Sequence, residues 1–188
     1  MIGHVLIHPI RADFDEDSLI VYQAYSDLIG KEAARCNTLN VPGFSQDRMT
    51  WIKPSFLWMM YRCGWGQKDE RQTTILRIRM KISAFRTILQ NSVLSNYSDV
   101  RNQTHGEWRE ALKRFPNRIQ WDPDKDEKLN RLERRAIQVG IAPEFVGSYV
   151  ASTLSVEGIT DLCQVIHREI REAGTSSKLP SERVLSLV

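Results

Sequence analysis

The sequence predicts a single α+β domain whose mixed β-sheet is split or strongly bent and flanked by helices. Three observations favour this class: a length of 188 residues, alternation of strand-like and helix-like segments, and a mixture of both in each half. This length suits one domain with its own hydrophobic core. We expect residues 1–174 to form that domain. A Gly-Thr-Ser-Ser-Lys-Leu-Pro linker follows, so we expect 175–188 to be a loose C-terminal tail.

The first half is predicted to run β-α-β-α-β. Residues 18–25 are rich in β-branched and aromatic types, which favours a strand. Residues 27–37 hold helix formers, and 49–53 form a short strand candidate. Residues 56–61 are apolar nearly all round, as in a deeply buried helix. Residues 71–81 alternate between apolar and basic side chains, which is the period of a strand with two different faces.

The second half is also mixed. Its predicted helices are 85–94, 107–115, 143–154 and 156–173, and its predicted strands are 118–122 and 135–141. The last helix carries a continuous apolar stripe. The charged segment 122–131 is expected to be a solvated loop or a short turn.

Composition excludes several classes of protein. Hydrophobic residues make up 41% and charged residues 26%, which does not fit a disordered chain, a collagen-like repeat or a disulfide scaffold. No apolar run approaches the roughly 18 residues of a membrane span, and the N-terminus does not resemble a signal peptide. The three cysteines are far apart, as free thiols in a reducing compartment would be, so we expect a cytoplasmic protein.

The charge balance permits acidic ligands without requiring them. The chain has 26 basic and 23 acidic residues, for a net charge of +3. A phosphate-bearing ligand or nucleic acid is compatible with this balance. The sequence has no GxxxxGK, GxGxxG, GxSxG, HExxH or CxxC motif, so the commonest nucleotide-binding folds, a serine hydrolase and a metal site are not predicted.

One segment, 44–65, concentrates aromatic and basic residues, including three of the five tryptophans. On a strand, Trp51 and Lys53 share one face, while Arg48 and Thr50 share the other. In a pocket wall the aromatic rings would stack on a planar ligand, and Arg48 or Lys53 would neutralise a phosphate. A core strand and helix whose charges reach the surface would have the same composition, so both interpretations stay open.

Strand 18–25 carries polar groups that burial would leave in need of partners. Tyr22, Gln23 and Tyr25 each require a hydrogen-bond partner if the strand is central. A bound ligand is one possible source of such a partner.

Two later strands carry amides among apolar neighbours. Gln120 lies in RIQWD and Gln138 in RAIQVGI, and two amides on neighbouring strands favour a lined cleft. Asp122 lies two residues after Gln120 and has two interpretations. It either starts the turn Asp-Pro-Asp or belongs to the cleft.

Four segments together resemble the domain-of-unknown-function family 4291. They are IRADFDEDSLIVYQAY, FSQDRMTWIKPSFLWMMYRCGWG, RIQWDPDKD and RAIQVGI. The resemblance runs from about Ile10 to Thr160 in the expected order, and DRMTWIKPSFLWMMYR is its most specific part. The N-terminal MIGHVLIHP and the tail after Gly174 lie outside it. The family's name implies no function.

A second resemblance is to the ADP-ribosyltransferase fold, which also opens with strand, helix, strand, helix and strand. It implies NAD as substrate and NAD-binding roles in the first two strand elements for Tyr22, Gln23, Tyr25, Arg48, Thr50, Trp51, Lys53 and Ser55. It implies catalytic roles for Gln138, Asp122 and Gln120. Under this resemblance Arg48 or Lys53 holds the diphosphate, Trp51 or Tyr25 stacks on nicotinamide, and Asp122 or Gln138 orients the ribose or the acceptor.

The resemblance implies a transferase that moves ADP-ribose from NAD to a protein or nucleic-acid acceptor. It departs from the usual pattern in one respect: no clear Arg-Ser-Glu or His-Tyr-Glu set is present, and Gln138 stands where a glutamate is usual. An amide cannot act as a base. The alternative hypothesis is a non-enzymatic module that binds a nucleotide or RNA in the same aromatic and basic cleft.

Overall fold

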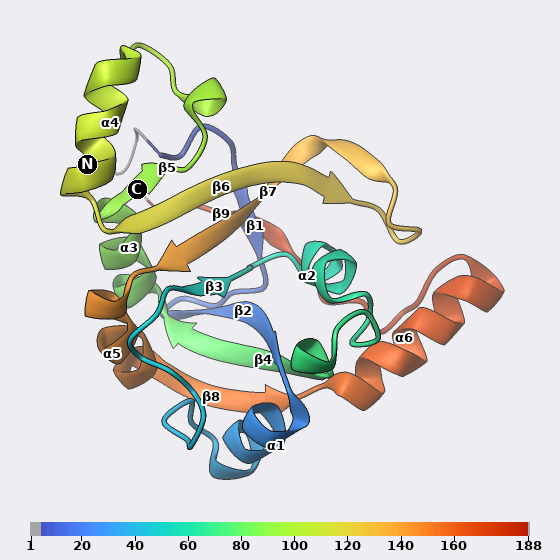
Figure 1. The fold of residues 1–188 in the computed structure, drawn as a ribbon. Helices are drawn as coiled ribbons and strands as arrows, with labels where there is room; N and C mark the ends of the chain where they lie inside the picture. The colour runs from blue at the N-terminus through green and yellow to red at the C-terminus, as the bar shows by residue number, and fades with distance from the viewer. Residues whose placement is uncertain (1–4, 188) are drawn as a thin grey trace.

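The computed structural model describes residues 5–187 as one α+β domain (Figure 1). Its strands are β1 (Ile10–Ala12), β2 (Ser18–Tyr25), β3 (Thr50–Ile52), β4 (Thr74–Lys81), β5 (Ser92–Leu94), β6 (Asn117–Lys125), β7 (Arg131–Ile141), β8 (Thr153–Gly158) and β9 (Arg183–Leu185). Its α-helices are α1 (Asp27–Cys36), α2 (Phe56–Cys63), α3 (Ile82–Gln90), α4 (His105–Arg114), α5 (Pro143–Ser152) and α6 (Thr160–Ala173), with short 3-10 turns at Glu70–Gln72 and Tyr97–Asp99. The predicted β-α-β-α-β opening corresponds to β2, α1, β3, α2 and β4 and is confirmed.

The main sheet is split, as predicted. One part has the order β2-β4-β8 and the other the order β3-β7-β6-β5; β5 and β6 are parallel, and the other pairs are antiparallel. The two parts meet at one bridge, where the backbones of Tyr22 and Lys53 exchange two hydrogen bonds of 2.8 and 3.2 Å. This junction places the end of β3 directly beside the middle of β2.

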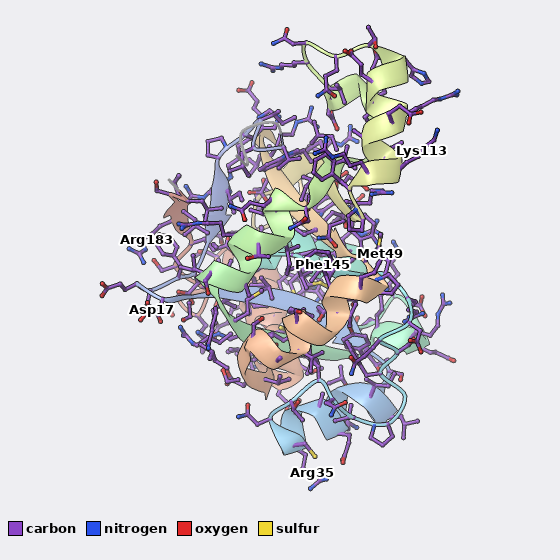
Figure 2. All side chains as sticks on the ribbon, turned by 90° about the vertical axis from the view of Figure 1, so that its left-hand side faces the viewer. Asp17, Arg35, Met49, Lys113, Phe145 and Arg183 are labelled. Carbon is purple, nitrogen blue, oxygen red and sulfur yellow. The ribbon has the colours of Figure 1, made fainter. Side chains whose placement is uncertain are left out.

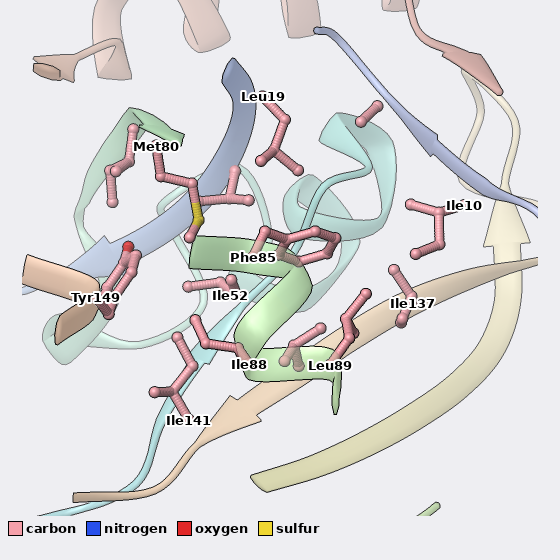
Figure 3. Packing of buried hydrophobic residues seen from close by; sticks show 14 of the residues in the cluster. Ile10, Leu19, Ile52, Met80, Phe85, Ile88, Leu89, Ile137, Ile141 and Tyr149 are labelled. Carbon is pink, nitrogen blue, oxygen red and sulfur yellow. The ribbon is translucent and has the colours of Figure 1, made fainter. Parts of the chain in front are cut away.

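The larger core lies between the two parts of the sheet. Alternation along β6 and β7 turns Ile137 and Ile141 inward, and Phe85 and Ile88 of α3 pack beside them with Tyr149 of α5 (Figure 3). Fully burying an aliphatic or aromatic side chain of this size stabilises the fold by about 1.5–3 kcal/mol. The opposite face of β6 and β7 does not join this core, which leaves it free to carry polar groups.

A second core covers the other face of β2. Ile20 and Tyr22 pack there against Phe56 of α2 and against Ile166 and Ile170 of α6. Because β2 is buried on both faces, it is central to the fold, as its composition predicted. The apolar stripe of α6 is real, although Leu162, which the sequence placed in the stripe, is 40% exposed.

Helix α2 begins and ends where its sequence indicates. The hydroxyl oxygen of Ser55 accepts a hydrogen bond of 3.4 Å from the backbone N–H of Trp58, and Ser55 is therefore the N-cap. Gly64 ends the helix at φ +57°, a left-handed conformation that favours glycine. The helix is thereby fixed across the β2–β3 junction.

Four element predictions need correction. The predicted helix 85–94 ends at Gln90, and residues 92–94 form β5. The predicted helices 143–154 and 156–173 are separated by strand β8, which takes residues from the ends of both. The charged segment 122–131 is only half turn, because β6 continues to Lys125 and the turn is confined to 126–130. The tail is not loose at 183–185, which pair with β1 as strand β9. Short strands of three to six residues give too few alternations to stand out from helix.

No helix among residues 5–187 is both long and apolar enough to span a membrane.

Candidate functional site

The strand register gathers several of the predicted site residues on the outer face of the four-stranded sheet. Gln120 of β6 lies opposite Gln138 of β7, and Trp51 of β3 lies opposite Gly140 of β7. Residues opposite one another in a ladder point to the same face, and so do residues two apart. Trp51, Lys53, Gln120, Asp122 and Gln138 therefore share one face, while the core residues of these strands occupy the other.

Asp122 is held by both amides. The Nε2 of Gln120 donates to its Oδ1 at 3.0 Å, and the Nε2 of Gln138 donates to its Oδ2 at 2.8 Å. Gln138 is buried, and Asp122 is half-buried. Asp122 forms no ion pair with any other described residue. The result is a carboxylate fixed by two neutral donors, with its negative charge available to a ligand. We call Gln120, Asp122 and Gln138 the Asp122 cluster.

A cavity of about 240 Å³ lies between β2, β3 and α2. Trp51 and Lys53, which share a sheet face with the Asp122 cluster, line it, whereas no member of the cluster does. Three cationic side chains line it: Arg48, Lys53 and Arg62. No aspartate or glutamate is among the described residues that line it. We call it the cationic cavity. Three positive charges facing one hollow without a counter-charge are suited to a phosphate-bearing anion.

Lys53 is the unusual member of the cationic cavity. The side chain is 7% exposed, and its one hydrogen bond to a described residue runs 3.4 Å from Nζ to the carbonyl oxygen of Trp51. Burial, reinforced by the positive charge of Arg62, lowers the pKa of Lys53 to about 8. The amine is thus mostly protonated at neutral pH, and it lacks the carboxylate partner that a buried ammonium normally has.

Trp51 forms a flat wall beside these charges. It is half-buried, and its ring lies against the backbone of Gly140. A Cβ at Gly140 would lie 3.0 Å from two ring carbons and 2.8 Å from the sulfur of Met49. Only glycine leaves room for the indole in this position. The ring is therefore placed on the same sheet face as the Asp122 cluster.

Gln23, Tyr25 and Thr50 line the cationic cavity, yet their polar atoms are bonded to one another. Gln23 Nε2 donates to Thr50 Oγ1 at 2.8 Å, the Tyr25 hydroxyl lies 3.1 Å from the same oxygen, and the Tyr149 hydroxyl donates to Gln23 Oε1 at 2.8 Å. Burial raises the pKa of Tyr25 to about 12 and that of Tyr149 further. We call these four residues the Gln23 network. It is neutral, enclosed and internally paired.

Besides the Asp122 cluster, two predicted NAD-binding residues do not line this cavity. Tyr22 points to the opposite face of β2 from Gln23, where its ring meets Phe56 edge-to-face at 5.4 Å; its hydroxyl has no hydrogen-bond partner among residues 5–187. Ser55 caps α2 and donates from Oγ to Asp124 Oδ1 at 3.1 Å. Tyr22 therefore contributes to packing and Ser55 to helix capping, and neither residue lines the cationic cavity.

Arg62 was present in the aromatic and basic segment but was not predicted as a ligand-binding residue. It lines the cavity together with Met59. The two residues are three positions apart on α2, a spacing that places them on one helix face. That spacing was the available signal, but which face of an almost wholly apolar helix meets the cavity depends on tertiary packing.

No group of three or more histidine, cysteine, aspartate or glutamate side chains within 5–187 is arranged to hold a metal ion.

Comparison with known families gives one match. The model of the domain of unknown function DUF4291 matches residues 9–185. The match covers nearly the whole chain, and the chain belongs to this family. It extends the sequence resemblance beyond Thr160 and includes most of the segment after Gly174. A search of curated proteins found no match.

Proposed function

We propose that this protein is an NAD-dependent ADP-ribosyltransferase that acts on a protein or nucleic-acid acceptor. The observation that carries the proposal is the Asp122 carboxylate, fixed by Gln120 and Gln138 at 3.0 and 2.8 Å. It faces the same side of the sheet as Trp51 and Lys53, which line the cationic cavity. The split sheet and the β-α-β-α-β opening support an ADP-ribosyltransferase-like fold.

The chemistry calls for a fixed negative charge at the reacting sugar. The bond between the nicotinamide nitrogen and ribose C1′ breaks, the electron pair leaves with nicotinamide, and positive charge develops on the ribose. In this proposal Asp122 stabilises that charge, because a preorganised carboxylate needs no reorganisation as the charge develops. The acceptor then forms the new bond to C1′ and releases its proton to water.

The remaining residues suit the rest of the dinucleotide. Arg48, Lys53 and Arg62 offset the charges of a diphosphate, and the unpaired ammonium of Lys53 gains the partner it lacks in the free protein. Trp51 offers a ring for stacking on nicotinamide. Holding both ends of the molecule fixes C1′ relative to Asp122.

The proposal also accounts for Gln138 where a glutamate is usual. The antiparallel register of β6 and β7 brings Asp122 within 2.8 Å of the Gln138 amide. The carboxylate thus comes from the neighbouring strand. Gln138 acts as a positioning residue, and Asp122 is the catalytic residue.

A nucleotide- or RNA-binding module without catalysis is the second candidate. The cationic cavity favours it, because three cations and no lining carboxylate bind an anion whether or not a reaction follows. The two functions differ in what they require of Asp122. Binding at the cavity tolerates its neutralisation, whereas transfer does not.

The deciding experiment incubates the purified protein with labelled NAD, alone and with cell extract that supplies protein and RNA acceptors. Released nicotinamide and transferred label are measured for the wild type, Asp122→Asn, and the exposed control Asp17→Asn (Figure 2). NAD affinity is measured in parallel by calorimetry, including Arg62→Gln.

Transfer or nicotinamide release that disappears only in Asp122→Asn, with NAD affinity retained, supports the transferase. Affinity without turnover in the wild type supports the binding module. No NAD affinity in folded protein overturns NAD as the ligand. Turnover in Asp122→Asn equal to the wild type overturns the assigned catalytic residue.

A further inference from the structure

Residues 95–116 form an arm that projects from the domain at the β5 edge of the four-stranded sheet. The arm contains the Tyr97–Asp99 turn and α4, and no residue of α4 is buried. Figures 1 and 2 show α4 standing beyond the rest of the fold, with Lys113 labelled on it in Figure 2. Its half-buried side chains, Trp108, Ala111 and Leu112, form the face that attaches it to the domain. The rest of its surface is exposed and contributes little to the core.

The arm is nevertheless firmly attached at its base. Trp108 Nε1 donates to the carbonyl oxygen of Leu94 in β5 at 2.9 Å, and the Arg118 guanidinium donates to the carbonyl oxygen of Leu112 at 2.9 Å. A capping box at Thr104 and Glu107 fixes the start of α4. The exposed surface is thus held in a defined shape.

Three aromatic rings gather on this surface. The ring centroids of Tyr97 and His105 are 4.8 Å apart, those of His105 and Trp108 are 5.3 Å apart, and those of Tyr97 and Trp108 are 5.5 Å apart. Tyr97 is 39% exposed, and His105 is exposed as well. A cavity of about 310 Å³ adjoins them, lined in part by Trp108, Arg101 and Gln103. Planar groups thus stand open to solvent beside a hollow.

The arm carries a net charge of +1, from four basic and three acidic side chains. Glu110 pairs with Lys113 at 2.7 Å, and Glu107 accepts hydrogen bonds from Thr104 without an ion pair. Within the described chain, Arg101, Arg109 and Arg114 form no ion pair with a carboxylate. These three guanidinium groups are therefore available to a ligand.

We propose that the arm binds single-stranded nucleic acid and, resting on the proposed function, that this strand is the acceptor. Exposed aromatic rings stack on bases of any sequence, and guanidinium groups contact the phosphates between them. A duplex keeps its bases stacked inside and offers the rings no planar partner. The exposed aromatic and cationic side chains therefore match a single strand.

The arm also lies within reach of the Asp122 cluster. Arg118, at the base of the arm, and Asp122 are four residues apart on β6 and on the same face, which corresponds to about 13 Å along a strand. Sites for single strands span about 4–16 nucleotides. A strand held by the arm can thus extend to the carboxylate.

The test is fluorescence anisotropy with labelled 12-nucleotide RNA, DNA of the same sequence and the corresponding duplex. The main variant is Arg101→Gln/Arg109→Gln. Its matched control is Arg168→Gln/Arg171→Gln, which removes the same charge from exposed positions on α6, a helix remote from the arm in Figure 1. A third variant, Tyr97→Leu, removes a stacking ring while keeping the charge.

We expect both single strands to bind more tightly than the duplex. The arm double variant should lose about tenfold in affinity at low salt and show a shallower salt dependence. Tyr97→Leu should lose about fivefold or more, and the α6 control should resemble the wild type. A preference between RNA and DNA identifies the natural strand.

Equal losses in the arm and α6 variants, equal affinity for the duplex, or no binding overturns the proposal. Nicotinamide release from NAD alone, measured on the same arm variants, separates it from the proposed function. If the wild type releases nicotinamide but binds no strand, the arm inference fails alone, whereas release that persists in arm variants with weakened strand binding supports it. If strand binding persists without any NAD chemistry, the transferase fails and the arm stands as the surface of a binding module.

Discussion

Strand β3 separates two polar clusters that are each built around a buried glutamine. On its core face, Thr50 joins Gln23 to Tyr25, and Tyr149 completes the Gln23 network. On its other face lies the Asp122 cluster, in which two amides hold one carboxylate. Both clusters were visible in the sequence as polar residues within apolar strands. Their surroundings differ in charge and in access to solvent.

The difference shows how to separate a structural polar cluster from a functional one. Every member of the Gln23 network is neutral and bonded to another member, so its partners are already supplied by the fold. The Asp122 cluster carries a carboxylate without an ion pair, on the same sheet face as the buried ammonium of Lys53, which also has none among the described residues. Groups left without partners in the free protein retain their capacity to bind. The following predictions test this distinction.

The largest expected effect is on the reaction rate of Asp122→Asn. The substitution keeps the size of the side chain and removes its charge. Loss of a preorganised charge-stabilising group slows the chemical step by at least about 100-fold. The free energy of unfolding should fall by about 1–3 kcal/mol, because the asparagine amide has one acceptor oxygen and can keep only one of the bonds from Gln120 and Gln138. Single-turnover nicotinamide release and urea unfolding measure the two effects. A large loss of stability with unchanged turnover would assign Asp122 to the fold.

The next effect is the pH dependence of stability caused by Lys53. Its folded pKa of about 8 lies below the ordinary 10.5 of a lysine. Between these values the unfolded chain keeps a proton that the folded chain has lost, so the free energy of unfolding rises with pH across this window. The cost of burying the charge is fully present below pH 8. It amounts to about 3 kcal/mol.

Lys53→Met tests this cost, because methionine fills similar space without a charge. The variant should be more stable than the wild type at pH 7, and the difference should shrink as the pH approaches 10.5. Its affinity for NAD should fall. Urea unfolding at several pH values provides the measurement. A stability difference that is constant with pH would contradict the idea that the site retains a costly buried charge.

Much of the fold could be predicted from the sequence where the pattern is long. Strands β2 and β4 have eight residues each, and α6 has fourteen, enough for their periods to be distinct. The missed strands include β5 and β9, with three residues each, and β8, with six. Their strand character comes from pairing with distant partners, and local sequence does not contain that information.

The candidate site was predicted only in part, because some of its contacts also depend on how distant strands pair. Alternation along one strand already placed Trp51 and Lys53 on a common face. The bonds from Gln120 and Gln138 to Asp122 depend on the register between β6 and β7, which no single strand encodes. Gln23 and Tyr25 were predicted to bind the ligand because the sequence did not show that Tyr149, more than 120 residues away, supplies the missing partner.

A smaller effect is expected when the Gln23 network is broken. Gln23→Leu leaves the hydroxyl of Tyr149 without its buried acceptor, while Thr50 keeps the contact with Tyr25, and we expect a cost of about 1–3 kcal/mol of unfolding free energy. Thermal unfolding should show a decrease of several degrees. The exposed Gln90→Leu serves as a matched control and should be nearly neutral. Turnover per folded molecule should hardly change. A strong loss of NAD affinity in correctly folded Gln23→Leu would move this network into the site.

The smallest effect concerns the positioning role of Gln138. In Gln138→Ala, Asp122 keeps the bond from Gln120 and loses the other, so it retains its charge but samples more orientations. We expect kcat to fall about tenfold, with little change in KM for NAD, because misorientation of a catalytic group affects mainly the transition state.

Gln138→Glu distinguishes this role from a purely structural one. It places a second carboxyl beside Asp122, and two carboxyls in one site raise the pKa of the pair. The activity profile should therefore shift, with activity lost at a higher pH than in the wild type as the medium is acidified, since the pair of carboxyls takes up a proton more readily than a single one. The rate measured against pH for both proteins provides the test. A uniform decrease at every pH, with no change in the profile, would indicate that Gln138 supports packing without orienting the carboxylate.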